Sequence, residues 1–174
     1  MMRATKWAPV IGAAMMLAAC GGEPEAPAQP EAADALLSGF YELSSEVTAL
    51  SSTDKTTPAT PLKVGDKQTI KACVIDGKPQ PELFAEHGQS PDKCEIKNSY
   101  IRHGRLSLQM SCKREGKRGE VMPAMMGSFT KDSFEGDIVA LSYFVEDGDY
   151  RMTRKVSAKR IGDCPAGGAE KAPA

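Results

Sequence analysis

The sequence predicts a mostly β domain, an antiparallel meander of about seven strands in a curled sheet or small barrel, with one short helix and two disulfides. Three observations carry this prediction. Apolar side chains alternate with polar ones along most of residues 37–165, which is the period of a half-buried strand. Turn residues separate these runs at short intervals. Four cysteines in the same region can close two disulfides.

Residues 1–36 precede this domain and are expected to target and tether it. Residues 1–19 join a positive start at Arg3 and Lys6 to a short apolar run that ends in Leu-Ala-Ala before Cys20. This pattern is typical of a bacterial lipoprotein signal peptide, with cleavage before Cys20 and acylation of that residue. The alternative, an ordinary secretory signal with a chance cysteine, is disfavoured because this ending is specific.

The lipid is expected to hold the chain at the cell envelope, facing the periplasm. By analogy with the sorting rule of enteric bacteria, Gly21 after Cys20 favours the outer membrane. Residues 20–36 are a linker rich in Pro, Ala and Glu, and residues 166–174 form a similar flexible tail. No later apolar run approaches the roughly 20 residues of a membrane helix, so the lipid is the expected attachment to the membrane.

The net charge of the chain without residues 1–19 indicates which classes of partner it can bind. Removing residues 1–19 takes away Arg3 and Lys6 and leaves all 23 acidic residues, so the formal charge falls from −1 to −3. This acidic balance disfavours nucleic acid as a partner. The remaining chain is long enough for one domain of ordinary size.

The first two strands are expected at residues 39–50 and 67–75. In the first, apolar and polar side chains alternate from Tyr41 to Ala49. Residues 51–65 are rich in Ser, Thr and Pro and are expected to form a long loop between the two strands.

A short helix is expected over residues 78–86. Its first turn can hold Pro79 and Pro81, and Gly88 can end it. We expect this helix to lie as a lid over one end of the sheet.

Residues 94–112 are expected to form a hairpin with a three-residue loop, in which Gly104 takes a left-handed conformation. The resulting register places Tyr100 opposite Leu106, Ile96 opposite Met110, and Cys94 opposite Cys112. A two-residue loop would shift the register by one and place Cys94 opposite Lys113. The apolar pattern disfavours that shift, because the apolar pairs would be separated.

This register predicts a cross-strand disulfide between Cys94 and Cys112, which leaves Cys73 to pair with Cys164. A zinc site built from the four cysteines is the alternative. Its ligands normally come as two close pairs, whereas the gaps here are 21, 18 and 52 positions. Neither histidine follows a signature of a catalytic cysteine.

Three further strands are expected, at residues 118–130, 133–145 and 149–162. The first turn, Lys131-Asp132, pairs Phe129 with Phe134 and Met125 with Ile138. The second turn, Asp147-Gly148, is a type I′ signal that pairs Tyr143 with Met152. Apolar residues change parity along the middle strand, from Phe134 and Ile138 to Val139, Leu141 and Tyr143, which predicts a bulge or a barrel-like bend.

Methionines are the first candidates for chemistry. Met122, Met125 and Met126, with Met110 and Met152 nearby, could bind Cu(I) through their thioethers. Alternation places Met125 on one face and the other two on the opposite face, so filling of an irregular core is the favoured interpretation.

Other polar residues point to no catalytic or metal site and no cofactor. His87 and His103 lie far apart in the expected pairing. Turn preference and solvation explain the acidic pairs Asp147 with Asp149 and Glu135 with Asp137. Basic residues gather at Lys113–Arg118 and along residues 151–160, where solvation of an outer face is favoured over contact with anionic lipid, peptidoglycan or an acidic partner.

The domain resembles a family of proteobacterial cell-envelope lipoproteins whose domain has no assigned function. The likeness spans residues 38–165, and Tyr41 stands where the family often carries Trp. The residues that carry it are Gly39-Phe40-Tyr41-Glu42, Cys73, Cys94-Glu95-Ile96, Met110-Ser111-Cys112, Gly127-Ser128-Phe129, Asp132-Ser133-Phe134 and Arg160-Ile161-Gly162-Asp163-Cys164-Pro165. The resemblance implies a periplasmic β domain and supplies no catalytic residue.

The expected function is therefore non-enzymatic, with the chain binding an envelope protein on an exposed strand or a small apolar ligand in a barrel mouth. Two alternatives remain open from the sequence: inhibition of a lysozyme-like hydrolase, and Cu(I) binding by the methionines. The oligomeric state does not follow from the sequence.

Overall fold

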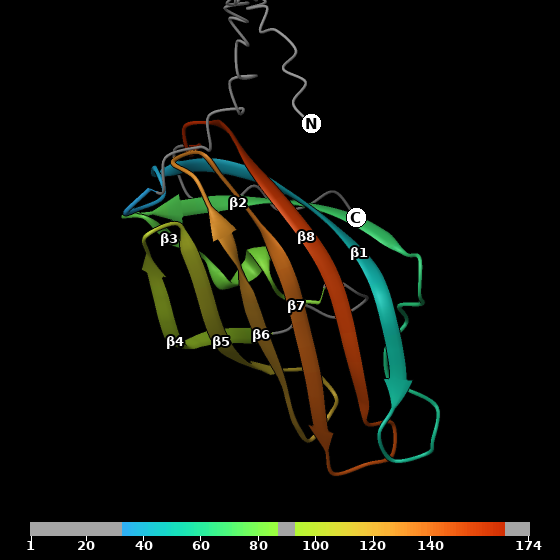
Figure 1. Cartoon of the computed structure of the whole chain (residues 1–174). Helices are drawn as coiled ribbons and strands as arrows, with labels where there is room; N and C mark the ends of the chain where they lie inside the picture. The colour runs from blue at the N-terminus through green and yellow to red at the C-terminus, as the bar shows by residue number, and fades with distance from the viewer. Residues whose placement is uncertain (1–32, 87–92, 166–174) are drawn as a thin grey trace, which may run out of the picture.

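The computed structural model describes residues 33–86 and 93–165, which form one antiparallel sheet of eight strands in the order β3-β2-β1-β8-β7-β6-β5-β4 (Figure 1). The sheet curls into a nearly closed barrel. The strands are β1 (Gly39–Ser52), β2 (Lys67–Ile75), β3 (Lys78–Pro79), β4 (Lys93–Arg102), β5 (Arg105–Lys113), β6 (Gly119–Phe129), β7 (Ser133–Phe144) and β8 (Tyr150–Gly162). The expected mostly β fold is confirmed, with one short strand more than the seven expected.

Several expectations fall outside the described residues. They concern the signal peptide at residues 1–19, the acylated Cys20 and most of the linker, His87, the helix stop at Gly88, and the tail at residues 166–174. In the part of the chain that the structure does describe, no helix is long and apolar enough to span a membrane.

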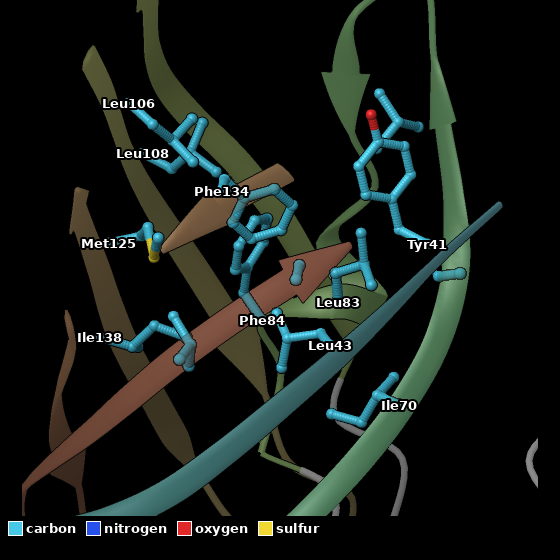
Figure 2. Close-up of a cluster of buried hydrophobic side chains, with 14 of the residues drawn as sticks. Tyr41, Leu43, Ile70, Leu83, Phe84, Leu106, Leu108, Met125, Phe134 and Ile138 are labelled. Carbon is cyan, nitrogen blue, oxygen red and sulfur yellow. The ribbon is translucent and has the colours of Figure 1, made fainter. Parts of the chain in front are cut away.

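Apolar and polar side chains alternate along the strands, as the sequence predicts, and the apolar ones form the core. In β1, Tyr41, Leu43 and Val47 are buried while their neighbours Glu42 and Thr48 point outward. Apolar side chains from nearly every strand meet inside the curled sheet (Figure 2). The Tyr41 and Phe134 rings stack with centroids 6.1 Å apart. Burial of this single core supplies the main driving force for folding.

The expected helix at residues 78–86 is wrong in kind. Lys78–Pro79 adds the short strand β3 to β2, and a 3-10 turn, η1, follows at Pro81–Leu83. Among the described residues this turn is the one helical element. Two prolines only two positions apart, Pro79 and Pro81, deprive an α-helix of N–H donors. The consecutive apolar residues Leu83 and Phe84 instead enter the core, where both are fully buried.

The strands β3 and β4 form the two edges of the sheet and do not pair with each other. Side chains of residues 81–86 fill the space between these edges. The turn η1 contacts both β2 and β4. Phe84 packs against Phe134 with ring centroids 5.7 Å apart, and Figure 2 shows Leu83 and Phe84 between the inner faces of the strands. We call residues 81–86 the plug. The expected lid therefore lies inside the barrel rather than across its end.

The β4–β5 hairpin contains both of the registers considered from the sequence, the one expected for a three-residue loop and the one expected for a two-residue loop. Near the disulfide, Cys94 pairs with Cys112 and Ile96 with Met110, as predicted. Beyond a bulge between Ile96 and Asn98 the register shifts by one, so Tyr100 pairs with Ser107 and not with Leu106. The turn has two residues, His103 and Gly104, at φ of 51° and 70°. The expected three-residue loop is wrong, because the bulge absorbs the extra residue.

In β6 and β7 the predicted register is confirmed, with Phe129 opposite Phe134 and Met125 opposite Ile138. Of the two features predicted from the change of parity in β7, the bulge is wrong, since the pairings of β7 with β6 and β8 run without a register shift. Ala140 and Ser142 continue the buried face. The apolar side chains Val139, Leu141 and Tyr143 consequently lie on the outer face, so both faces of this strand carry apolar residues.

The β7–β8 connection is longer than the predicted type I′ turn. Met152 pairs with Ala140, not with Tyr143, and the ladder between the two strands ends at the pair of Leu141 with Arg151. Carboxylates organise the loop. Asp149 Oδ1 accepts hydrogen bonds from Ser142 Oγ at 2.9 Å and Phe144 N at 2.8 Å. Asp54 Oδ2 accepts from the backbone N–H groups of residues 148 and 149, and its Oδ1 accepts from the hydroxyl and the N–H of Thr56. The Thr56 bonds, and after them those from residues 149 and 148, lower the pKa of Asp54.

A glycine pair allows the sheet to curl. Gly127 and Gly136 face each other across β6 and β7, and both side-chain positions point inward. A Cβ atom on Gly127 would meet the carbonyl oxygen of Glu135, and one on Gly136 would meet that of Met126. The two strands therefore approach too closely for any other residue, as at the corner of a barrel.

Candidate functional site

The outer face of β6 and β7 carries a group of apolar side chains, which we call the outer apolar patch. Its members are Met122, Ala124, Met126, Val139, Leu141 and Tyr143. Cross-strand pairing makes it continuous, because Met122 lies opposite Leu141 and Ala124 opposite Val139. Met122, Met126 and Tyr143 are 46%, 70% and 54% exposed. Contiguous exposed apolar surface of this kind is typical of an interaction site.

Polar side chains frame the outer apolar patch. On the β5 side, Gln109 pairs with Ala124 and Ser107 with Met126. On the β8 side, Arg151 pairs with Leu141. An apolar centre with a polar rim is the usual composition of a protein–protein interface.

The rest of the outer face, toward the β4–β5 and β6–β7 turns, is polar. One cross-strand row of outward residues runs through Ser128, Glu135, Ser157 and Ser44. Two shallow hollows of about 550 and 340 Å³ lie along it and share Glu135 and Ser157 in their walls. The outer face thus divides into an apolar half and a hydroxyl-rich half.

The interior holds a second unusual region, the buried polar cluster of Glu86, Arg114, Tyr150 and Arg154. The Tyr150 hydroxyl donates to the Glu86 carboxylate at 2.8 Å, and Arg114 Nη2 lies 2.9 Å from Glu86 Oε2. Arg114 also donates to the Ala59 carbonyl at 2.6 Å. Burial and the neighbouring carboxylate raise the pKa of Tyr150, so its phenol remains a neutral donor at physiological pH.

Arg154, which lies on β8, also binds the plug. Its side chain is 1% exposed and donates to the backbone carbonyls of Ala85 and Phe84. Together with the Glu86 contacts, these bonds hold the last three residues of the plug. Glu86, Arg114 and Tyr150 thus bond to one another, and Arg154 bonds to the backbone. Buried charged groups are normally held by hydrogen bonds of this kind.

Sequence reasoning missed this cluster. Arg114 and Arg154 were expected to solvate an outer face, and that expectation is wrong. The alternation of β8 contained the signal for Arg154, because Met152 and Val156 on either side of it are buried. Glu86 and Arg114 lie outside regular strands, so no period marked them. Only the folded chain brings residues 86, 114 and 150 together.

The methionines divide as alternation predicts. Met125 is buried in the core, while Met122 and Met126 lie on the outer face. Met110 and Met152 belong to two separate core clusters. The five thioethers therefore do not converge on one point.

The remaining candidates are scattered. His103 lies on the β4–β5 turn, 3.2 Å from Asp34. Glu135 and Asp137 point outward along β7, and Asp137 faces Lys155. Asp149 serves the β7–β8 loop. Across residues 33–86 and 93–165, no three His, Cys, Asp or Glu side chains come close enough to hold a metal ion.

The two disulfides pair as expected. Cys94–Cys112 crosses the β4–β5 hairpin with Cα atoms 4.0 Å apart. Cys73–Cys164 joins β2 to the chain just after β8, with Cα atoms 5.8 Å apart and 91 positions between them.

These features define a small disulfide-bonded β domain whose interior is occupied by its own side chains and whose unusual surface lies outside. A family model described as a protein of unknown function, DUF3617, matches residues 29–164, and the chain belongs to this family. The resemblance to a domain without an assigned function is thereby confirmed. No curated protein and no solved structure matches the chain.

Proposed function

We propose that this chain is a lipid-anchored protein of the bacterial cell envelope that acts by binding a protein partner through the outer apolar patch. The acylated Cys20 would hold it at the periplasmic face of the outer membrane, as the signal pattern indicates. The observation that carries the proposal is the row of Met122, Leu141 and Tyr143 on one sheet face, in which Met122 and Tyr143 are exposed and Leu141 is half-buried.

The position of the patch favours a protein over a small molecule. Small apolar ligands bind in concave sites that enclose most of their surface, whereas the outside of a curled sheet is convex. The interior, the other place for such a ligand, holds Leu83, Phe84 and their neighbours (Figure 2). A partner that presents its own apolar side chains, with polar groups meeting Gln109 and Arg151, fits this surface best.

A photo-crosslinking amino acid at position 143, in intact cells, tests the proposal. We expect it to form one covalent adduct with an envelope protein. The same amino acid at position 135, on the same strand and the same outer face but in the polar half, is the matched control and should form none. Leu141→Ser should abolish the adduct at position 143 while the chain remains folded. Equal adducts at both positions, or an adduct only with a second copy of the chain, would overturn the proposal.

Lipid attachment is tested separately. Mass spectrometry of the chain isolated from membranes should find Cys20 as the first residue, carrying acyl chains. Cys20→Ser should release the chain from the membrane fraction. A chain that retains residues 1–19, or an unmodified Cys20, would contradict this part of the proposal.

A further inference from the structure

We propose that one end of the barrel rests directly on an anionic membrane surface, an inference that rests on the lipid anchor of the proposed function. This end, which we call the tether end, is where the N-terminal segment enters the sheet. It comprises residues 33–38, 75–78, 102–105, 130–133 and 159–165, and it is the upper end in Figure 1.

Hydrogen bonds bring these segments together. Gly104 N donates to the Ala33 carbonyl at 2.8 Å, and Leu37 N donates to the Lys131 carbonyl at 2.7 Å. Arg160 N donates to the Asp132 carbonyl at 2.8 Å. The N-terminal segment is thereby fixed against two hairpin turns and the end of β8. Ala33, the first residue that the structure describes, therefore lies at this end.

Exposed apolar side chains surround the start of β1 at the tether end. Leu37, Ile75 and Ile161 are 50%, 51% and 48% exposed. Their positions follow from the register, in which Gly39 pairs with Val74 and Phe40 with Gly162. Large apolar side chains beside a lipid anchor are suited to insertion among headgroups.

Cations predominate at the same end. The tether end contains six basic residues, Lys78, Arg102, Arg105, Lys131, Lys159 and Arg160, and four acidic ones, Asp34, Asp76, Asp132 and Asp163. Asp34 is paired with His103, and Asp163 with Arg160. Arg102, Arg105, Lys131 and Lys159 form no ion pair with any described residue. Basic side chains next to a membrane anchor are attracted to anionic leaflets.

The larger hollow of the outer face opens at this end and suits a phosphate-bearing headgroup. Arg105, Ser128, Thr130 and Ser133 line it, which combines a guanidinium with three hydroxyls. Glu135 forms part of its wall and would disfavour an anion at that side.

Because the lipid anchor already holds the chain at the bilayer, weak contacts are sufficient to dock the tether end on the membrane surface. Thirteen positions separate Cys20 from Ala33, a span of at most about 45 Å even when fully extended. A chain held this close to a bilayer experiences a high effective concentration of headgroups. Docking by the tether end would leave Tyr143 and the outer apolar patch facing the periplasm, where a partner could reach them.

An introduced tryptophan tests the proposal, because the single tryptophan, Trp7, lies in the expected signal peptide. Leu37→Trp is compared with Val145→Trp, in the β7–β8 loop at the opposite end, where the native side chain is even more exposed (67% against 50%). The mature chains are added to vesicles of phosphatidylcholine with or without phosphatidylglycerol and with brominated acyl chains. We expect a blue shift and quenching for Leu37→Trp with phosphatidylglycerol, and neither for Val145→Trp.

Charge reversal provides the second arm. Arg102→Glu combined with Arg105→Glu should weaken the partitioning about tenfold or more, and high salt should do the same. Equal quenching at both tryptophans, or quenching independent of phosphatidylglycerol, would overturn the proposal. The mature chain with Cys20→Ser is measured in parallel at high vesicle concentration, so failure of the docking surface is distinguished from failure of lipidation.

Discussion

The buried polar cluster and the outer apolar patch both depart from the usual arrangement of a sheet, in which apolar side chains face the core and charged ones face solvent. Glu86 and Arg154 carry charge into the interior, whereas Met122, Leu141 and Tyr143 carry apolar surface to the outside. The buried charges meet partners within the chain. The outer side chains stay open to solvent, which indicates that the first region stabilises the fold and the second is available to another molecule.

Removing the carboxylate of the cluster should have the largest effect. Glu86→Ala should lower the free energy of unfolding by about 3–5 kcal/mol, because Arg114 would remain buried without its counter-ion. Urea denaturation at neutral pH measures this loss. Glu135→Ala, which removes an exposed carboxylate from the outer face, should change stability by no more than about 0.5 kcal/mol. Similar losses in both variants would contradict a stabilising role specific to the cluster.

A smaller loss is expected when the plug is released from β8. Arg154→Met keeps much of the side-chain volume but removes the donors to Phe84 and Ala85. Each unsatisfied buried carbonyl costs about 1–3 kcal/mol. Lys155→Met alters the next, outward position and serves as the control. If the two variants unfolded at the same urea concentration, Arg154 would not hold the plug.

The free energy of unfolding at alkaline pH tests the role of Tyr150 in the buried polar cluster. Its folded pKa lies above the ordinary value of 10.0, so its stabilising effect is complete below pH 10 and declines as the unfolded chain ionises above that pH. Tyr150→Phe should cost about 1 kcal/mol at neutral pH and flatten the decline between pH 10 and 11. Tyr143→Phe, which removes an exposed phenol, should leave the decline as it is. Denaturation series at several pH values read out both effects.

The smallest effect on stability is expected from the outer apolar patch. Leu141→Ser should change the free energy of unfolding by no more than about 0.5 kcal/mol, because the side chain points away from the core. The same variant should lose the crosslink to a partner from position 143. A loss of several kcal/mol in urea denaturation would show that Leu141 serves the fold instead.

The β class, the strand positions and the disulfide pairing could be predicted from the sequence. Alternation and turn residues act locally, and the pairing of Phe129 with Phe134 follows from one short turn. The pairing of Cys94 with Cys112 follows in the same way. Errors appeared where a remote contact outweighed a local preference. The β7–β8 turn is longer than its Asp-Gly signal because Asp54, 94 positions earlier, binds its backbone.

The outer apolar patch shows a different limit. Val139, Leu141 and Tyr143 break the alternation expected of a strand with one solvent-exposed face, so the pattern predicted a bulge or a barrel-like bend. The structure retains a regular β7 and leaves these residues outside. The alternation of a single strand predicts that its apolar residues face the core, and it does not by itself identify those that lie on the outer face.

The sequence alone determined which residues form strands, how β6 pairs with β7 across their short turn, and that Cys94 lies opposite Cys112, because these features depend on contacts between residues close in the chain. Tertiary structure decided that Leu83 and Phe84 fill the barrel and that Glu86 meets Arg114 and Tyr150. Those contacts join distant segments, and their energy exists only once the curled sheet has enclosed a space from which water is excluded.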